Sequence, residues 1–360
     1  MKLFPWSLST PAGDRPPGFS TWLAAGLIGS AAALGAAPAA AQMTPIKFQL
    51  DWRFEGPAAL FLLPKAKKYF EAEKLDVTID SGNGSGNAVN RVASGAYDIG
   101  FADMAALMEF WGNNAGMPNK PVAVMMVYAN TPAAVFSLKK SGIKAPADLI
   151  GKKVGAPVFD AGRKAFPVFA AANKLDQAKV NWVSMDPPLR ETMLVRGDVD
   201  AITGFYFTSL LNLNARGVKD EDIAILPYPQ YGVKHYGNVI IASEKLLKEK
   251  PEVVKAFLRA FTKGVKEVLA NPDAAVKVVK ARDPIIDEAL ELRRLKLAIQ
   301  GSIATDDAKA EGFGEIRGPR LALMASQVKD AFALKESLDP EKIFDSGFLP
   351  SKADRDIFSR

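Results

Sequence analysis

The chain has 360 residues, of which 48% are hydrophobic and 24% are charged, a composition typical of globular proteins. Its net charge of +6 comes without a run of consecutive Lys or Arg, which argues against a nucleic-acid-binding face. The absence of cysteine and the presence of a single histidine, His235, exclude disulfides, thiolate metal sites, cysteine nucleophiles and His-rich metal sites.

The first 41 residues have the organisation of a secretory leader. Lys2 and Arg15 are the basic residues of this region, an apolar stretch occupies residues 22–37, and alanines follow at 39–41. This order of charged, apolar and A-x-A segments is typical of a cleavable signal peptide. A single membrane anchor is the alternative, although the stretch is rich in Ala and Gly and shorter than the ~20 strongly apolar residues of a spanning helix. We expect a signal peptide over residues 1–41 and a mature protein in the periplasm.

After residue 45, strand and helix patterns alternate. Short apolar or alternating runs predict strands at 46–52, 75–80, 99–102 and 122–128. Amphipathic runs between them predict helices at 57–70, 87–94 and 104–113. The continuously apolar run at 122–128 is typical of a strand buried on both faces. This alternation predicts a mostly parallel sheet covered by helices.

A second unit of the same kind follows, as expected for a chain longer than one compact core usually organises. Its predicted strands lie at 133–138, 153–155, 180–183, 200–205 and 224–226, and its predicted helices at 146–149 and 162–173. A further strand at 237–242 precedes predicted helices at 252–270, 273–280, 286–299 and 319–332. The fold class is therefore α/β, with two α/β lobes.

Candidate ligand-binding residues follow from the rule that open α/β sheets bind ligands at the carboxyl ends of their strands. The residues at or just after the predicted strand ends are aromatic, hydroxyl-bearing or acidic, which suits a small planar or polar ligand. They are Asp51, Trp52, Phe54, Glu55, Gly84, Ser85, Asn87, Asp103, Tyr128, Asn130, Phe159, Asp160, Arg163, Thr203, Phe205 and Tyr206.

Several of these candidates have a second interpretation. The loop at 81–86 (SGNGSG) is either a flexible turn or a place where the backbone approaches a ligand and Ser85 donates to it. Asp103 either accepts a hydrogen bond from the ligand or caps the helix that starts at Met104. Arg163 either binds a ligand carboxylate or is a solvated surface charge, and each aromatic candidate is either a ligand contact or part of the core.

A series of short motifs, taken in order, resembles the nitrate/sulfonate/taurine and thiamine-pyrimidine-precursor binding proteins. The motifs are LDW at 50–52, KKYF at 67–70, LDV at 75–77, ASGAYDIG at 93–100, AD at 102–103 and DLIGKKVG at 148–155. The resemblance covers essentially the whole mature chain and is most specific over its first eighty residues. The sequence departs from the family at Pro64, Lys68 and Lys74, and the loop at 53–57 (RFEGP) differs from that of the pyrimidine-precursor binders.

The resemblance implies a type II periplasmic binding protein fold, in which two crossing strands join the lobes. The crossings are expected near residues 131–135 and 236–240. Lobe I would then comprise residues 42–132 and 238–360, and lobe II residues 133–237. Pro64 is expected to kink or shorten the first helix.

The resemblance also implies a receptor that captures a small molecule by hinge closure and delivers it to an ABC permease and its ATPase. We expect a monomer with no cofactor, no metal and no nucleic-acid partner. The expected ligand is a small heteroaromatic molecule such as a thiamine-type pyrimidine precursor, with a sulfonate, nitrate or aromatic carboxylate as alternatives.

Two other classes of protein share this fold. One class is an enzyme. The same fold family includes a fungal pyrimidine-precursor synthase that has a Cys-rich iron motif and several histidines. Hydroxymethylbilane synthase shares the two-lobed shape and tethers its cofactor through cysteine. This chain has no cysteine and one histidine, so we expect no enzyme activity. The other class is a sensor domain, which the leader and the lack of a signalling segment disfavour.

Overall fold

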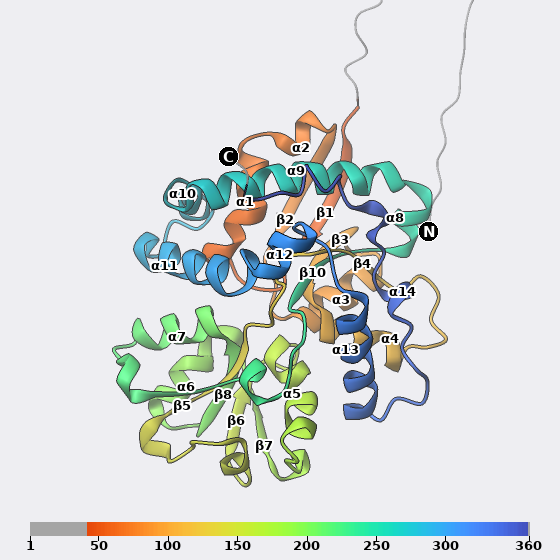
Figure 1. Ribbon diagram of the computed structural model, residues 1–360. Coiled ribbons are helices and arrows are strands. Elements are labelled where there is room, and N and C mark those ends of the chain that lie inside the picture. The colour runs from red at the N-terminus through yellow and green to blue at the C-terminus, as the bar shows by residue number, and fades with distance from the viewer. Residues whose placement is uncertain (1–41, 359–360) are drawn as a thin grey trace, which may run out of the picture. The chain divides into compact units, whose positions relative to one another are not determined.

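The computed structural model describes residues 42–358, in which two five-stranded sheets organise the chain (Figure 1). The expected signal peptide at 1–41 lies outside the described residues. Within residues 42–358, no helix is both long and apolar enough to cross a membrane.

The first sheet has the order β2-β1-β3-β10-β4. Its strands are β1 (Thr44–Gln49), β2 (Leu75–Asp80), β3 (Ile99–Asp103), β4 (Val122–Met126) and β10 (Asn238–Ala242). Strand β1 is parallel to β2 and β3, whereas β10 is antiparallel to both β3 and β4. All residues of β3, β4 and β10 are buried, which explains why their sequences are apolar runs rather than alternating patterns.

The second sheet repeats this arrangement in the order β7-β6-β8-β5-β9. Its strands are β5 (Ala133–Leu138), β6 (Lys153–Ala156), β7 (Asn181–Ser184), β8 (Ala201–Phe205) and β9 (Ile223–Pro227). Strand β6 is parallel to β7 and β8, and β5 is antiparallel to β8 and β9. The antiparallel strand of each sheet is the one that the chain enters from the other sheet, so the prediction of mostly parallel sheets is confirmed.

We call the first sheet with its helices lobe 1 and the second sheet with its helices lobe 2. The helices of lobe 1 are α1 (Ala59–Ala66), α2 (Tyr69–Ala72), α3 (Ser85–Ala93), α4 (Met104–Asn113), α8 (Glu244–Glu249), α9 (Pro251–Ala270), α10 (Pro272–Arg282), α11 (Glu288–Ala298), α12 (Asp306–Glu311), α13 (Gly318–Ala331) and α14 (Pro340–Ile343). Those of lobe 2 are α5 (Ala161–Ala172), α6 (Arg190–Arg196) and α7 (Tyr206–Asn214).

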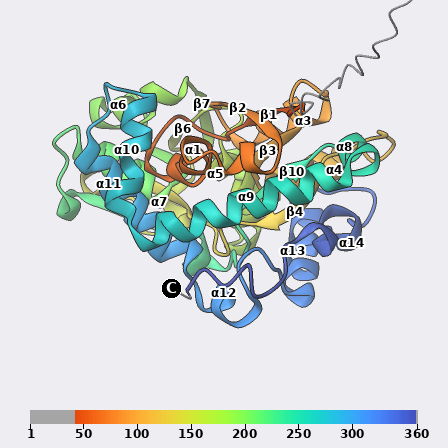
Figure 2. The same ribbon diagram turned by 90° about the horizontal axis from the view of Figure 1, so that it is seen from above.

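The long helix α9 runs across lobe 1 (Figure 2), and aromatic rings pack it against β1 and α1. The ring of Phe48 on β1 lies 4.8 Å from that of Phe61 on α1 and 5.4 Å from that of Phe257 on α9. All three side chains are buried, and such ring pairs stabilise a core beyond the area that they bury. This core holds β1 in place, and the end of β1 leads into the site described below.

Two connecting segments, residues 127–132 and 228–237, run between the sheets side by side. The backbone N–H of Gly237 donates to the carbonyl oxygen of Tyr128 at 2.8 Å, and that of Thr131 donates to the carbonyl oxygen of His235 at 3.1 Å. His235 therefore lies where the chain crosses between lobes. Its ring is buried and its Nε2 lies 3.0 Å from Oε1 of Gln327 on α13.

The helix expected at 57–70 is divided, which corrects that prediction. A 3₁₀ turn, η1 (Gly56–Ala58), precedes α1, which contains Pro64 and ends at Ala66. Lys68 then adopts a left-handed backbone with φ of 58°, so the chain turns before α2 begins. The pattern analysis also missed helices α6, α7, α8, α12 and α14, of which α6 and α7 matter most for the site.

Candidate functional site

A cavity of about 50 Å³ lies between the two lobes and is lined by residues of both. The carboxyl ends of strands face this cavity: residues directly after β1, residues in the loops after β2 and β6, and the last residue of β8 line it. This is the position that the strand-end rule predicts. The lining residues are Leu50, Asp51, Trp52, Arg53, Glu55, Pro57, Ala58, Phe61, Gly84, Ser85, Phe101, Tyr128, Asp160, Ala161, Arg190, Phe205, Phe207 and Thr208.

Aromatic rings form much of the wall. Tyr128 packs edge-on against Phe101 at 5.3 Å and Phe207 at 5.8 Å, and Phe205 lies 5.8 Å from Phe207. The indole Nε1 of Trp52 is buried and has no hydrogen-bond partner within residues 42–358. Flat apolar walls with such a polar group suit a planar ligand with a few polar substituents.

Asp51 is the buried carboxyl group that follows β1. It accepts a hydrogen bond from Asn238 Nδ2 at 2.7 Å and one from Ser85 Oγ at 3.4 Å. Burial raises the pKa of Asp51 to about 7, because the hydrogen bonds from Asn238 and Ser85 only partly offset the loss of water. Asp51 therefore changes its protonation near neutral pH.

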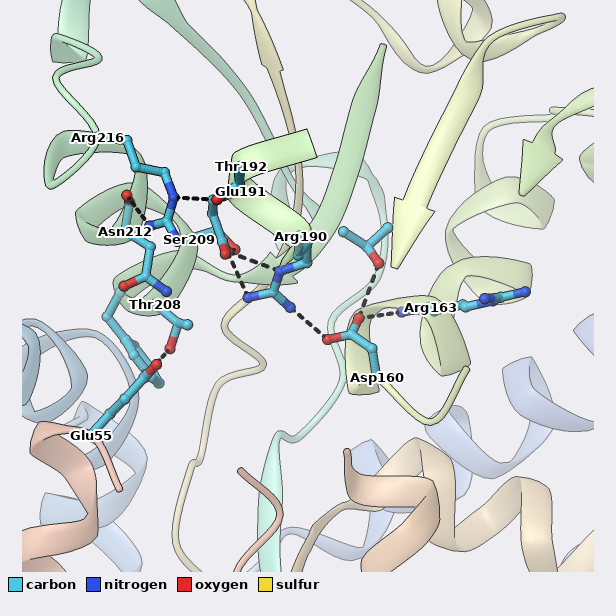
Figure 3. A network of polar contacts seen from close by, with 12 residues as sticks. Glu55, Asp160, Arg163, Arg190, Glu191, Thr192, Thr208, Ser209, Asn212 and Arg216 are labelled. Carbon is cyan, nitrogen blue, oxygen red and sulfur yellow. Dashed lines mark hydrogen bonds and ion pairs between the residues drawn. The ribbon is translucent and has the colours of Figure 1, made fainter. Parts of the chain in front are cut away.

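Arg190, the first residue of α6, is the buried cation of the site (Figure 3). Its Nη1 donates to Asp160 Oδ2 at 2.9 Å, and its Nε donates to Glu191 Oε1 at 2.9 Å. Burial opposes the charge of Arg190, but the two carboxylates outweigh it and raise the pKa of the guanidinium. The charge of Arg190 is thus neutralised by protein groups.

The carboxylates that hold Arg190 are themselves fixed by lobe 2. Asp160 also accepts from Thr203 Oγ1 at 3.0 Å and from the backbone N–H of Arg163 at 2.9 Å. Glu191 accepts from Ser209 Oγ at 2.9 Å. The guanidinium of Arg190 is consequently held in one orientation.

A second buried ion-pair group joins the lobes beside the cavity. Thr208 Oγ1 of lobe 2 donates to Glu55 Oε2 of lobe 1 at 2.8 Å. Arg294 on α11 lies 3.5 Å from the same Glu55 oxygen and donates to Glu291 Oε2 at 2.8 Å. Its Nη1 also donates to the carbonyl oxygens of Phe207 and Thr208, at 3.0 and 2.9 Å.

Half of the residues predicted for the site line this cavity. They are Asp51, Trp52, Glu55, Gly84, Ser85, Tyr128, Asp160 and Phe205. The other half lie elsewhere: Phe54, Asn87, Asp103, Asn130, Phe159, Arg163, Thr203 and Tyr206.

Asp103, Arg163 and Thr203 have partners within the protein. Asp103 Oδ1 accepts from the backbone N–H of Ala105 at 2.9 Å, which is the helix-capping alternative. Arg163 Nη1 donates to the carbonyl oxygen of Ala156 and to Ser184 Oγ, while Thr203 Oγ1 donates to Asp160. Thr203 therefore contacts the cavity-lining Asp160 and does not line the cavity itself.

The remaining candidates do not line the cavity either. Phe54 lies beneath the guanidinium of Arg282 at 4.6 Å, and Tyr206 is 38% exposed. Asn130 Nδ2 donates to the carbonyl oxygen of Gly301. Phe159 borders a different, polar cavity together with residues of α3 and α4, and Asn87 is partly buried on α3.

Sequence reasoning missed Arg190, Phe207 and Thr208 because it missed α6 and α7. A signal for α6 exists: prolines at 187 and 188 precede it, and Gly197 follows it with φ of 80°. Proline before and glycine after an apolar-periodic run mark the ends of a helix. Nothing in the local pattern shows that Arg190 faces a residue of the other lobe, since that contact joins segments far apart in sequence.

The arrangement defines a class of protein. Two α/β lobes joined by crossing segments, with a cavity between them, form the periplasmic binding protein fold. Residues 42–358 contain no group of three or more His, Cys, Asp or Glu side chains placed to hold a metal ion.

Comparison with known proteins gives the family. Residues 58–275 match the family described as NMT1/THI5 like, and the chain belongs to it. A formylaminopyrimidine-binding protein of Halalkalibacterium halodurans is 27% identical over 68% of this chain and 74% of the relative. A riboflavin-binding protein of Chloroflexus aurantiacus is 26% identical over 81% of this chain and 82% of the relative.

One further relative is named as an enzyme, and a solved structure has a similar fold. A 4-amino-5-hydroxymethyl-2-methylpyrimidine phosphate synthase of Aspergillus parasiticus is 26% identical over 67% of this chain and 71% of the relative. An alkanesulfonate-binding protein of Xanthomonas axonopodis has the same fold, with a TM-score of 0.65 at 12% identity over 83% of this chain and 96% of that chain.

Proposed function

We propose that this protein is the periplasmic solute receptor of an ABC importer and that it captures a small heteroaromatic molecule between its lobes. The inter-lobe cavity with aromatic walls and buried carboxyl groups is the observation that carries this proposal. A ligand that contacts both lobes stabilises the closed form by as much as its affinity differs between the open and closed forms. We propose that residues 42–132 with 238–360 and residues 133–237 are the two bodies that move, and that the closed monomer docks on the permease.

The charges around the cavity favour a ligand that donates hydrogen bonds over an anion. The carboxyl groups of Asp51, Glu55 and Asp160 line the cavity. Two cations, Arg53 and Arg190, line it as well, and Arg190 is already paired with Asp160 and Glu191. An anionic ligand would face these carboxyl groups at short range, where repulsion is strong. An amino-substituted heteroaromatic ring would instead donate to Asp51 and stack on the aromatic walls.

The loop at residues 81–86 (SGNGSG), which we call the glycine loop, also disfavours an anion. The amides of its three glycines are used within the protein: Gly82 N donates to the carbonyl oxygen of Trp52, Gly84 N to that of Asp51 and Gly86 N to that of Phe159. Ser85 donates to Asp51. An anion site at a helix N-terminus needs free N–H groups, so sulfonate and nitrate become the second choice of ligand.

The names of the two bacterial relatives support a heteroaromatic ligand, since formylaminopyrimidine and riboflavin are both nitrogen heterocycles. The fungal relative is named as a synthase, which keeps an enzyme as the second candidate. The chain has no cysteine, and its single histidine is buried against Gln327, away from the cavity lining. We therefore favour binding without chemistry.

Thermal-shift screening of the chain from Gln42 onward tests this function. The panel contains formylaminopyrimidine, riboflavin, an alkanesulfonate, nitrate and an aromatic carboxylate. A molecule that binds the folded but not the unfolded chain raises the melting temperature. We expect a shift with a heterocycle and none with nitrate; the opposite pattern would refute the ligand class. Recovery of the bound molecule unchanged, checked by mass spectrometry, separates a receptor from an enzyme.

A further inference from the structure

The lobes contact each other directly on both sides of Arg190, through Gly86 and Arg294 of lobe 1, neither of which lines the cavity. Figure 3 shows Asp160 on one side of Arg190 and Glu55 on the other. Near Asp160 the contact is made by the glycine loop of lobe 1, and near Glu55 it is made by α11 of lobe 1.

At the glycine loop, the backbone of lobe 1 contacts the backbone of lobe 2. Gly86 N donates to the carbonyl oxygen of Phe159 at 3.2 Å, so lobe 1 is hydrogen-bonded to the segment after β6. A Cβ atom added to Gly84 would lie 2.2 Å from the same carbonyl oxygen. A Cβ atom added to Gly86 would meet Lys164 at 3.2 Å and Phe159 at 3.3 Å, both in lobe 2. Glycine here lets the two lobes approach closely.

An ion pair adds to this contact. Lys164 Nζ of lobe 2 lies 2.9 Å from Glu109 Oε1 on α4 of lobe 1, and both side chains are largely buried. The glycines therefore bring together two lobes that also attract each other electrostatically at this edge.

On the other side, Arg294 reaches across from α11. It is 1% exposed, and besides its bonds to the carbonyl oxygens of Phe207 and Thr208 it donates to Asn212 Oδ1 at 2.9 Å. All three acceptors belong to α7 of lobe 2. Glu291 and Glu55 hold the guanidinium on the lobe 1 side, which fixes its direction.

We propose that Gly86 and Arg294 are positioning residues for ligand binding: they hold the lobes closed around the cavity without touching the ligand. Gly86 adjoins the cavity-lining Gly84 and Ser85, and Arg294 binds the backbone of the cavity-lining Phe207 and Thr208. This inference rests on the proposed receptor function. The apparent dissociation constant equals the intrinsic one divided by the closed fraction, so a tenfold loss of closed form weakens binding about tenfold.

Distance measurement between the lobes tests the proposal without any ligand. The chain has no cysteine, so Lys277→Cys in lobe 1 and Ala147→Cys in lobe 2, both exposed positions, accept a pair of spin labels selectively. In this background Gly86→Leu inserts a side chain between the lobes at a helical position, where leucine is a better helix former than glycine. Gly116→Leu is the matched control, because a Cβ atom there would meet nothing within 4 Å.

Arg294→Lys tests the other contact. Lysine keeps the positive charge beside Glu55 and Glu291, but a single ammonium cannot reproduce the planar fork that binds two carbonyls and an amide. Arg259→Lys is its control, since Arg259 makes a two-bond pair with Glu73 inside lobe 1.

We expect Gly86→Leu and Arg294→Lys to shift the distance between the two spin labels away from that of the parent. Both variants should also bind formylaminopyrimidine about tenfold more weakly. The controls, Gly116→Leu and Arg259→Lys, should keep the parental distance. Parental distances in both test variants would overturn the proposal, whatever the ligand. If the distances shift but formylaminopyrimidine does not bind the parent, the proposed ligand fails and the proposed closure contacts stand.

Discussion

The guanidinium of Arg190 in lobe 2 lies 4.9 Å from the ring centroid of Trp52 in lobe 1. Asp160 and Glu191 accept hydrogen bonds from Nη1 and Nε of Arg190, while Nη2 lies 2.8 Å from Glu191 Oε1 without an aligned hydrogen bond to any residue within 42–358. The two side chains meet at the boundary of the lobes, and both line the cavity.

Trp52→Ala should abolish most of the ligand-induced thermal shift. The change removes a large aromatic wall, and loss of such a contact costs about 1.5–3 kcal/mol, or roughly tenfold to a hundredfold in affinity. Trp52 is only partly buried, so the ligand-free melting temperature should change little. Trp52→Phe is the control and should retain much of the affinity; equal binding by Trp52→Ala and the parent would place the ligand elsewhere.

Asp160→Asn should destabilise the protein itself. It removes a charge that neutralises the fully buried Arg190, and breaking one partner of a buried pair typically costs about 3–5 kcal/mol. Urea denaturation measures this loss. Asp176→Asn, at an exposed ion pair with Lys179, is the control and should cost less than about 1 kcal/mol. A similar small cost in both variants would show that the Arg190 network contributes little to folding.

Asp103→Ala should lower stability by about 1 kcal/mol and leave the ligand-induced shift intact, because Asp103 caps α4 and does not line the cavity. Asp103→Ser retains an N-terminal cap and should recover part of the loss in the same denaturation experiment. If Asp103→Ala folds normally but no longer binds the ligand, Asp103 contacts the ligand and this interpretation is wrong.

Asp51 should make stability depend on pH. Its folded pKa is about 7 against 3.8 in the unfolded chain, so between these values the folded state holds a proton that the unfolded state has lost. The free energy of unfolding should therefore fall as pH rises from about 4 to about 7, by up to about 1.4 kcal/mol per pH unit for this one group.

Asp51→Asn removes that dependence, and the difference between parent and variant isolates it. Two other groups contribute over this range in both proteins: Asp103, whose pKa burial also raises to about 7, adds a slope of the same sign as Asp51, and His235, whose pKa burial lowers to about 4, adds the opposite slope. Urea denaturation at a series of pH values measures the difference. A parent and variant with parallel pH profiles would show that Asp51 is ionised in the folded protein.

The sequence predicted much of the fold because most elements have local signals. Strands β2 and β5 and helix α4 begin and end where their patterns predict. The predicted residues that line the cavity lie at or shortly after the ends of recognised strands, as Asp51 and Asp160 do. Arg190 and Arg294 could not be found in this way, since their roles depend on contacts with the other lobe or with carboxylates distant in sequence.

The glycine loop shows the same limit. Its composition indicated either flexibility or a ligand contact, whereas the structure places Gly86 against Phe159 of lobe 2. This contact joins the segment after β2 to the segment after β6, and no local sequence pattern indicates that the two segments meet.

Isothermal titration calorimetry of the chain from Gln42 onward tests the central claim most directly, with formylaminopyrimidine and an alkanesulfonate compared side by side. The receptor described above predicts saturable one-to-one binding of the heterocycle that Trp52→Ala removes. Tight binding of the sulfonate with no heat from the heterocycle would contradict it.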